Sequence, residues 1–497
     1  MAMTSWGTHD PDARFNTLFP SVSKTANIFY PGGLFLRDGL SDRTTVVLQN
    51  GSTIVFDNTA FVTANLTTIA SGADLYRELG LVSGKASAPL SAATYKLADN
   101  RYAANYAQGG FPTPMGNTLG GDMAWFLPEG PALKNIAILV LNNFQYTPDI
   151  LDFSNPESGR ELWKLLGDFV SKAKAAGCAK LVIDMQGNGG GQLPRLAATY
   201  YTLFPEAAAG IFPMQSQARA HPQLSWLQNA PRTGSSKYPL AWSFGMYRQL
   251  NGTPFPDTHT WLGPITTPFG NLTVPASTDP EIFVDRVNSP ADFPPKVPTS
   301  PPFAPENITI VTDGECNSAC ALLVEVLTHK HKIRTVALGG RPLYKAMQAV
   351  GRTKGAPVAN FGGFPAIDRA TAPPGVEVVP TTGPALRLRT TLSDERRGRY
   401  GGGVRFNMAN QTPLGEAADA LPLQFRYEAA HCKVFWTWEM ARDIKKVWER
   451  VADVAWGEGR CVEGSTTGEG GKMGNTTRGY EEGVEDEGSF GPGPGAL

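Results

Sequence analysis

The 497-residue chain has no run of about 18 consecutive apolar residues, so no membrane-spanning helix is expected. It has no excess of either charge, with 44 Lys and Arg against 45 Asp and Glu, which argues against a nucleic-acid surface. It has only five cysteines and no second Cys or His pair at zinc-ligand spacing, so neither a metal site nor a cofactor is predicted. The 41% hydrophobic content indicates a globular protein. The length of 497 residues is enough for two or three domains.

The first residues, MAMTSWGTH, also lack the apolar core of a signal peptide. The chain nevertheless carries seven N-x-S/T sequons, where its composition gives roughly three by chance. These two features conflict unless the N-terminus of the natural protein lies upstream of Met1. We therefore expect the protein to be a glycoprotein that is either secreted or located in the secretory pathway. The sequons begin at Asn50, Asn65, Asn251, Asn271, Asn307, Asn410 and Asn475.

Two regions with different patterns of apolar residues follow one another along the chain. Residues 1–130 are rich in Gly, Thr and alternating apolar positions, and Asn50-Gly51 between two β-like runs predicts a hairpin. Residues 131–465 begin with an apolar strand at 136–141, a helix with leucines at helical spacing, and a second strand at 180–184. Strand, helix and strand in this order predict a βαβ unit, and hence an α/β fold with a parallel sheet.

Three further segments complete the organisation. Residues 205–306 are proline-rich with little helical period, and we interpret them as a long loop insertion into the α/β core. Apolar residues on one face predict a helix from Thr437 to Trp456, and a disulfide between Cys432 and Cys461, which bracket it, is expected. The tail, residues 466–497, has the composition of a disordered segment.

Ser318 lies at the junction of a β-type run and an apolar helix. Residues 308–312 read as a buried strand, Asp313-Gly314 as a turn, and 319–327 as a helix that is buried on most sides. Unpaired N–H groups at such a helix start favour an anionic oxygen, which suits a nucleophile of acyl transfer. Simple N-capping by Ser318 is the alternative. Cys316 and Cys320 lie on either side of this serine, and Cys178 ends an earlier helix.

A run of three glycines, 189–191, follows the strand at 180–184. Glycines at the carboxyl end of a parallel strand leave backbone N–H groups open to a ligand. The lysine and Ser/Thr of a phosphate-binding P-loop are missing, so an oxyanion hole fits better. A plain tight turn is the alternative.

Four motifs in order make the chain resemble the S41 family of serine peptidases, the tail-specific proteases, and their fungal branch related to chlamydial protease-like activity factor. The resemblance covers roughly residues 10–465 and implies a crotonase-like core with Ser318 as nucleophile. It also implies an oxyanion hole formed by the amides of Gly189, Gly190 and Gly191 together with Ala319. The motifs are Leu181–Gly191, Val311–Cys320, Gly339–Pro342 with Met347–Gly351, and Pro422–Ala430 running on to Cys461–Ser465.

The catalytic base is the missing part. In the fungal branch the histidine lies in an N-terminal segment, and residues 10–20 resemble a block that follows it, so the chain is expected to begin downstream of the base and of most of a PDZ-like module. His9 is the histidine nearest that end and matches no motif of the family. His329 and His331 lie eleven and thirteen residues along the helix, roughly 16–20 Å away, and are interpreted as helix C-terminal charges.

Lys345 and Glu377 are the other candidates. Tail-specific proteases elsewhere in the family use a Ser–Lys dyad, and Lys345 lies in the segment where that lysine is expected, although a lysine base requires burial. Glu377 would orient a histidine if one were present. The alternative for each is a solvated surface charge.

These residues suggest a serine peptidase acting on a peptide or protein substrate, with no nucleic-acid partner. A second hypothesis is an inactive or truncated family member that binds peptide without cleaving it. A third is a crotonase-type acyl-CoA enzyme that uses the glycine amides without a nucleophile. This third hypothesis lacks a basic cluster for the CoA phosphates.

Overall fold

The structure is a computed structural model of the whole chain. It describes residues 8–17, 43–47, 51–57, 70–71, 74, 110–118, 121–144, 156–221, 224, 245, 247–268, 270–278, 300–355, 358–360, 405–407 and 409–477. None of the helices in these ranges is long and apolar enough to cross a bilayer. Glu377 and most of the predicted tail lie outside these ranges.

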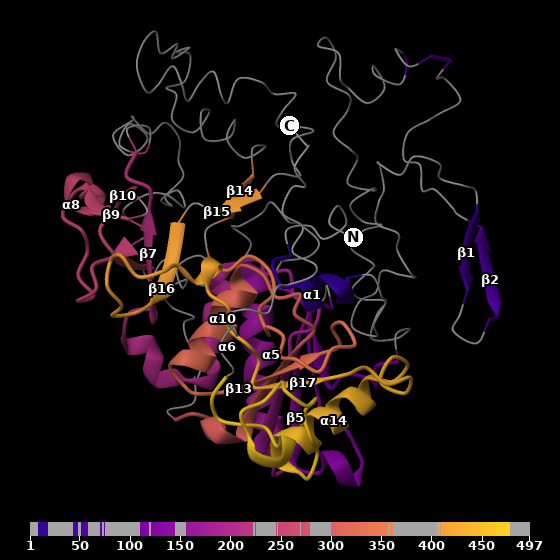
Figure 1. Cartoon of the computed structure of the whole chain (residues 1–497). Coiled ribbons are helices and arrows are strands. Elements are labelled where there is room, and N and C mark those ends of the chain that lie inside the picture. The colour runs from indigo at the N-terminus through magenta and orange to yellow at the C-terminus, as the bar shows by residue number, and fades with distance from the viewer. Residues whose placement is uncertain are drawn as a thin grey trace.

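A seven-stranded mixed sheet forms the centre of the molecule (Figure 1). Its first five strands, from β17 to β5, run parallel, and the last two pair antiparallel at one edge. The predicted strands 136–141, 180–184 and 308–312 have the expected bounds. In spatial order the strands are β17 (Cys432–Val434), β13 (Arg334–Leu338), β12 (Ile308–Thr312), β6 (Lys180–Asp184), β5 (Ile136–Leu141), β4 (Met123–Phe126) and β3 (Gly116–Asn117). Because β3 and β4 join it, this sheet starts before residue 131, where the sequence analysis placed the start of the core.

Helices cover both faces of the sheet. Side chains alternate between the two faces along a strand, so Ile310 of β12 packs into one core while Val311 packs into the other. The first core contains residues of α5 (Pro156–Ala175), α6 (Leu193–Leu203) and α10 (Ala319–His329), and the second contains residues of α14 (Ile444–Trp456). Burial on both faces explains the continuous apolar runs of the central strands.

The helix α14 is shorter than the sequence predicted. It begins at Ile444 because the Asp443 carboxylate caps the Lys445 N–H, whereas residues 437–442 form turns that bury Met440. A disulfide joins Cys432 in β17 to Cys461 beyond the helix. The helix is therefore fastened to the edge strand at its far end.

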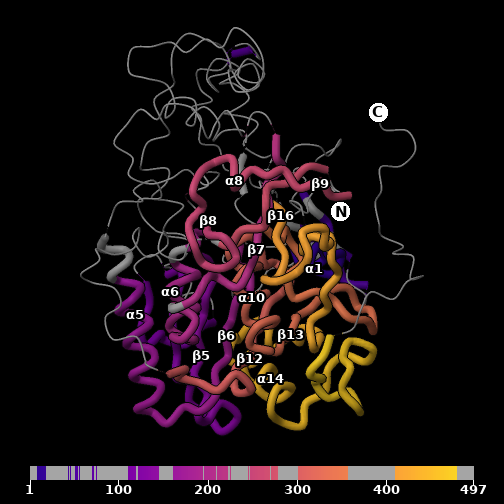
Figure 2. The backbone as a smooth tube through the Cα atoms, turned by 90° about the vertical axis from the view of Figure 1, so that its left-hand side faces the viewer, coloured from indigo at the N-terminus to yellow at the C-terminus, as the bar shows by residue number. Residues whose placement is uncertain are grey.

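The proline-rich segment 205–306 is more regular than predicted. It contributes three strands to a four-stranded antiparallel sheet, and the fourth strand, β16 (Ala409–Pro413), comes from much later in the chain. Figures 1 and 2 both show β7 and β16 at the same end of the central sheet as α1 (Pro11–Asn16). The strands are β7 (Met214–Ala218), β8 (Tyr247–Arg248) and β11 (Ala276–Thr278), with α8 (Thr258–Leu262), β9 (Ile265–Thr267) and β10 (Gly270–Leu272) nearby in the sequence.

Short elements complete the described chain. The predicted hairpin is present as β1 (Arg43–Val47) and β2 (Thr53–Asp57). The expectation of disorder is wrong for residues 466–477, where Thr466 and Met473 are buried. The remaining elements are β14 (Val358–Asn360), β15 (Arg405–Asn407), η3 (Pro131–Leu133), η4 (Pro205–Ala209), η6 (Pro305–Asn307), η9 (Leu423–Phe425) and η10 (Glu469–Gly471).

Candidate active site

Ser318 occupies a strained turn between β12 and α10. Its φ of 55° and ψ of −118° lie in a region that residues with a side chain rarely adopt, at a cost of about 1–3 kcal/mol. Its side chain makes no capping hydrogen bond, so the N-cap alternative is not what holds it there. Its backbone N–H donates to the Thr353 carbonyl at 3.0 Å, and its carbonyl accepts from Leu322 N–H at 2.9 Å. Ser318 as a whole residue is partly exposed.

A disulfide between Cys316 and Cys320 spans this turn, with Cα atoms 5.3 Å apart. Both cysteines are fully buried at the start of α10. The sequence analysis noted the two cysteines but did not predict their bond. The bond restricts the backbone on both sides of Ser318.

The glycine loop after β6 packs directly against this turn. Gly190 has a φ of +90°, and a Cβ placed on it would overlap the Asn317 carbonyl oxygen and stand 2.9 Å from Ser318 Cβ. Asn317 N–H donates to the Asn188 carbonyl at 3.2 Å. The two segments follow neighbouring parallel strands, β6 and β12, so their carboxyl ends meet at one edge of the sheet.

The amides of this region differ in their availability. Gly190 N–H already donates to Asn188 Oδ1 at 2.8 Å, whereas the bridge between Gly191 and Phe144 is formed by the N–H groups of Phe144 and Gln192. Within the described chain, the N–H groups of Gly189, Gly191 and Ala319 have no hydrogen-bond acceptor. Gly189 is exposed, and a Cβ there would meet nothing within 4 Å. Of the four expected oxyanion residues, only Gly190 therefore has its N–H already occupied.

No base contacts the Ser318 hydroxyl among the described residues. His9 reaches the neighbouring loop through its backbone, where its N–H donates to the Gly351 carbonyl at 2.7 Å. Burial, together with Lys354 and Arg14, lowers the pKa of His9. Lys345 is exposed on a loop, without the burial that a lysine base needs and without a contact to Ser318. Glu377 lies outside the described residues.

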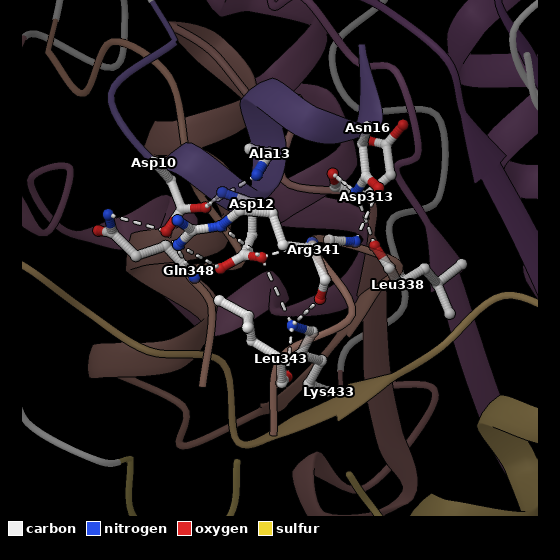
Figure 3. A network of polar contacts seen from close by, with 11 residues as sticks. Asp10, Asp12, Ala13, Asn16, Asp313, Leu338, Arg341, Leu343, Gln348 and Lys433 are labelled. Atoms are coloured by element: carbon white, nitrogen blue, oxygen red, sulfur yellow. Dashed lines mark hydrogen bonds and ion pairs between the residues drawn. The ribbon is translucent and has the colours of Figure 1, made fainter. Parts of the chain in front are cut away.

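The helix α1 closes one side of this region through polar contacts (Figure 3). Asp12 pairs with Arg341 at 3.3 Å and with the fully buried Lys433 at 3.5 Å. Asn16 Nδ2 donates to the carbonyls of Asp313 and Leu338, at 2.8 Å each. These contacts fix α1 at the carboxyl ends of β12 and β13, beside the turn that leads to Ser318.

Asp10 continues this network towards the Ser318 loop. Its Oδ1 accepts from Asp12 N–H and Ala13 N–H and so caps α1, while its Oδ2 accepts from Gln348 N–H at 3.2 Å. Burial raises the pKa of Asp10, opposed by these hydrogen bonds. The sequence analysis missed this network, because capping and ion-pair residues leave no periodic apolar pattern.

Two buried aspartates lie beneath the glycine loop. Asp313 Oδ1 accepts from the N–H groups of Gly187 and Glu315, and so ties the loop after β6 to the loop after β12. Asp184 accepts a hydrogen bond from Trp448 Nε1 at 2.9 Å. Burial raises the pKa of Asp184 to about 6, although its hydrogen bonds oppose the shift.

A cluster of four ionisable side chains, here called the Lys354 cluster, lies two turns along α10. It comprises Lys354, Glu325, His329 and Glu428. Donor atoms of Glu325, His329 and Glu428 lie within 4.8 Å of one another and are the group of described residues best suited to hold a metal ion. Lys354 already contacts both carboxylates, at 2.6 Å for Glu428 and 3.8 Å for Glu325. A bound cation would have to compete with this ammonium.

The chain is similar in sequence to known proteins. A family model described as CPAF-like PDZ domain matches residues 1–67. Peptidase S41 family protein ustP of Aspergillus flavus is 25% identical over 500 residues, covering 91% of this chain and 98% of that protein. Peptidase S41 family protein phomP1' of Diaporthe leptostromiformis is 25% identical over 512 residues, covering 91% of this chain and 73% of that protein. The resemblance to the S41 peptidases is confirmed.

Among solved structures, mature CPAF matches with a TM-score of 0.31 and 13% identity. The match covers 64% of this chain and 50% of the CPAF chain, so the present chain spans about half the length of that protein. The resemblance to S41 peptidases rests on the sequence matches, each of which covers 91% of this chain.

Proposed function

We propose that the chain is a serine-type peptidase that cleaves peptide bonds through an acyl-enzyme at Ser318. The observation that carries the proposal is the juxtaposition of a strained, partly exposed serine with two open backbone amides, those of Gly189 and Ala319. Strained backbone of this kind collects at functional sites. The S41 relatives add a family-level reason for peptidase chemistry.

The reaction follows from these groups. Ser318 Oγ attacks the carbonyl carbon of the scissile peptide and its proton passes to a base, so that the carbonyl oxygen becomes an oxyanion between the Gly189 and Ala319 amides. Collapse of this tetrahedral intermediate breaks the C–N bond, and the leaving amine takes up a proton. Water then hydrolyses the acyl ester and restores Ser318. The crotonase-like description of the core belongs to this same proposal.

The base is not among the residues whose contacts are described, and this favours one alternative. A chain without a base would bind peptide at the same site without cutting it. We keep an inactive or truncated family member as the second candidate. The acyl-CoA hypothesis finds no support, because a serine flanked by a buried disulfide has no role in it.

Labelling by a fluorophosphonate tests the proposal. We expect a single labelled residue, Ser318, found by peptide mass mapping, and no labelling of Ser318→Ala. Cleavage of an unfolded protein substrate is measured in parallel. Absence of both labelling and cleavage would contradict the peptidase proposal. Peptide binding without cleavage, with turnover restored by an upstream segment that contains a histidine, would favour the truncated alternative.

We also propose that the protein enters the secretory pathway. Two disulfides suit an oxidising compartment, and the sequon asparagines Asn251, Asn271 and Asn475 are exposed. Expression in a eukaryotic host with a leader should give a product whose mass falls after enzymatic removal of N-linked glycans. A product without glycans at these three sites would contradict the glycoprotein part.

A further inference from the structure

Ser318 is held in its strained conformation from outside its own segment. Its N–H donates to the Thr353 carbonyl, and Thr353 directly precedes Lys354. Since a strained residue persists only when its surroundings fix it, whatever fixes Thr353 also fixes Ser318. The loop 351–355 is therefore the first place to look for a positioning device.

Lys354 is the anchored residue of that loop. Its side chain is 4% exposed, and its Nζ donates to Glu428 Oε2 at 2.6 Å and to the Arg426 carbonyl at 3.3 Å. Glu325 Oε1 lies 3.8 Å from the same nitrogen. Glu325 belongs to α10, seven residues after Ser318, which is roughly 10 Å along the helix. Lys354 thus connects the loop that holds the Ser318 amide to the helix that Ser318 begins.

His329 completes the cluster on the opposite side of the carboxylates. Its Nε2 lies 2.9 Å from Glu325 Oε2 and 2.8 Å from Glu428 Oε1. These hydrogen bonds raise the pKa of His329 to about 10, so the imidazole is charged at neutral pH. Two cations then balance two carboxylates, and each carboxylate is held on both sides. Such a cluster serves as a rigid connection, because every buried charge has a partner.

The opposite end of the loop is held equally firmly. Gly351 N–H donates to the Gly314 carbonyl at 2.9 Å, and the Gly351 carbonyl accepts from both His9 N–H and Asp10 N–H. The Thr353 carbonyl therefore lies between two fixed points, Gly351 and Lys354. Loss of either should release it.

From this arrangement we infer that Lys354 is a positioning residue for Ser318, acting through the Thr353 carbonyl and anchored by Glu325, His329 and Glu428. Its catalytic meaning rests on the proposed peptidase function, but the positioning itself does not. A merely structural role would lower global stability without a specific effect at the Ser318 turn. The two roles therefore predict different measurements.

Hydrogen–deuterium exchange of the native full chain gives the primary test, with the peptide 314–322 as the readout. In Lys354→Met we expect exchange there to quicken by about tenfold, as a local opening, while peptides of β5 and β6 stay protected. Val451→Ala, in α14 on the other face of the sheet, is the control of similar lost stability and should leave this peptide unchanged.

Two further variants separate position from charge. Lys354→Met with Glu428→Gln restores the charge balance but not the connection, so its exchange should remain fast. Lys354→Arg keeps both the charge and the contacts, so the exchange of peptide 314–322 should be nearly as slow as in the wild type. In the fluorophosphonate reaction, the maximal inactivation rate should fall in Lys354→Met while the concentration for half-saturation stays constant.

Slow exchange of peptide 314–322 in Lys354→Met, at the level of Val451→Ala, would overturn the inference. So would full recovery in the charge-balanced double variant. A wild-type chain that does not react with fluorophosphonate would refute the proposed peptidase instead, and the exchange result would still decide whether Lys354 positions Ser318.

Discussion

Replacement of Gly190 by alanine should disturb the Ser318 turn more than any other single methyl group added to the glycine loop. A Cβ at this position would overlap the Asn317 carbonyl oxygen, stand 2.9 Å from Ser318 Cβ and 3.1 Å from Ala319 N. These neighbours are backbone or the first side-chain carbon, so they cannot move aside by a rotamer change. The strained φ of +90° adds about 1–3 kcal/mol for a residue with a side chain, and overpacking adds about 1–3 kcal/mol more.

Gly189 provides the matched control, one residue earlier in the same loop. It has no positive φ, it is exposed, and a Cβ there would meet nothing within 4 Å. Gly189→Ala keeps the backbone N–H and should change stability by less than about 1 kcal/mol, in the stabilising direction. The same chemical change at adjacent positions is thus expected to differ by about 2–7 kcal/mol in its effect on stability.

Urea unfolding of both variants measures this difference, with the slope of the transition as a check that the unfolded states are comparable. The reaction of Ser318 with fluorophosphonate should slow in Gly190→Ala and stay near the wild-type rate in Gly189→Ala. Equal stability and equal labelling in the two variants would refute the close packing of the glycine loop on the serine turn. Slower labelling in Gly189→Ala alone would refute the expectation that Gly189 serves only through its N–H.

Three further measurements test other parts of the structure. The pKa of Asp184 is raised to about 6 from an ordinary 3.8, so the free energy of unfolding should fall by about 3 kcal/mol as pH rises from 4 to 6. In Asp184→Asn this pH dependence, which reflects the binding of one proton, should be absent. Burial lowers the pKa of His431 to about 4, so its contribution to the free energy of unfolding is present above pH 6.5 and is lost as pH falls to 4. This pH dependence is opposite in sign to that of Asp184, and His431→Gln should remove it. An unchanged pH profile in either variant would contradict the assigned burial. Thiol titration of denatured, unreduced protein should find one free cysteine, Cys178, and three or five would contradict the disulfides 316–320 and 432–461.

The parts of the fold that the sequence predicted are those determined by local pattern. Continuous apolar runs between turns located β5, β6 and β12 with their observed bounds. The meeting of Ser318 and the glycine loop also follows from sequence, because carboxyl ends of parallel strands lie at one edge. Only the adjacency of β6 and β12 had to be supplied by the structure.

The parts that could not be predicted depend on pairing between distant segments. The strand β16 pairs with β7 although about two hundred residues separate them, so the region 205–306 looked irregular when taken alone. Strands β3 and β4 extend the sheet from a segment that read as β and loop. The bond between Cys316 and Cys320 had competing partners, since five cysteines allow several pairings.

The segment around α1 shows why the N-terminal region cannot be separated from the Ser318 site. Lys433 is fully buried, and its Nζ lies against Asp12 and the carbonyls of Arg341 and Leu343. Burial lowers the pKa of Lys433, and Asp12 opposes that shift. If α1 left its place, the Lys433 ammonium would lose its carboxylate partner inside the protein, which is far more costly than losing a surface pair. The residues that α1 fixes include the loop at Gly351, which leads to Thr353 and thus to the Ser318 amide. The N-terminal helix is therefore a structural part of the site. A chain without it would retain Ser318 but would lose the contacts that hold the Ser318 backbone in place.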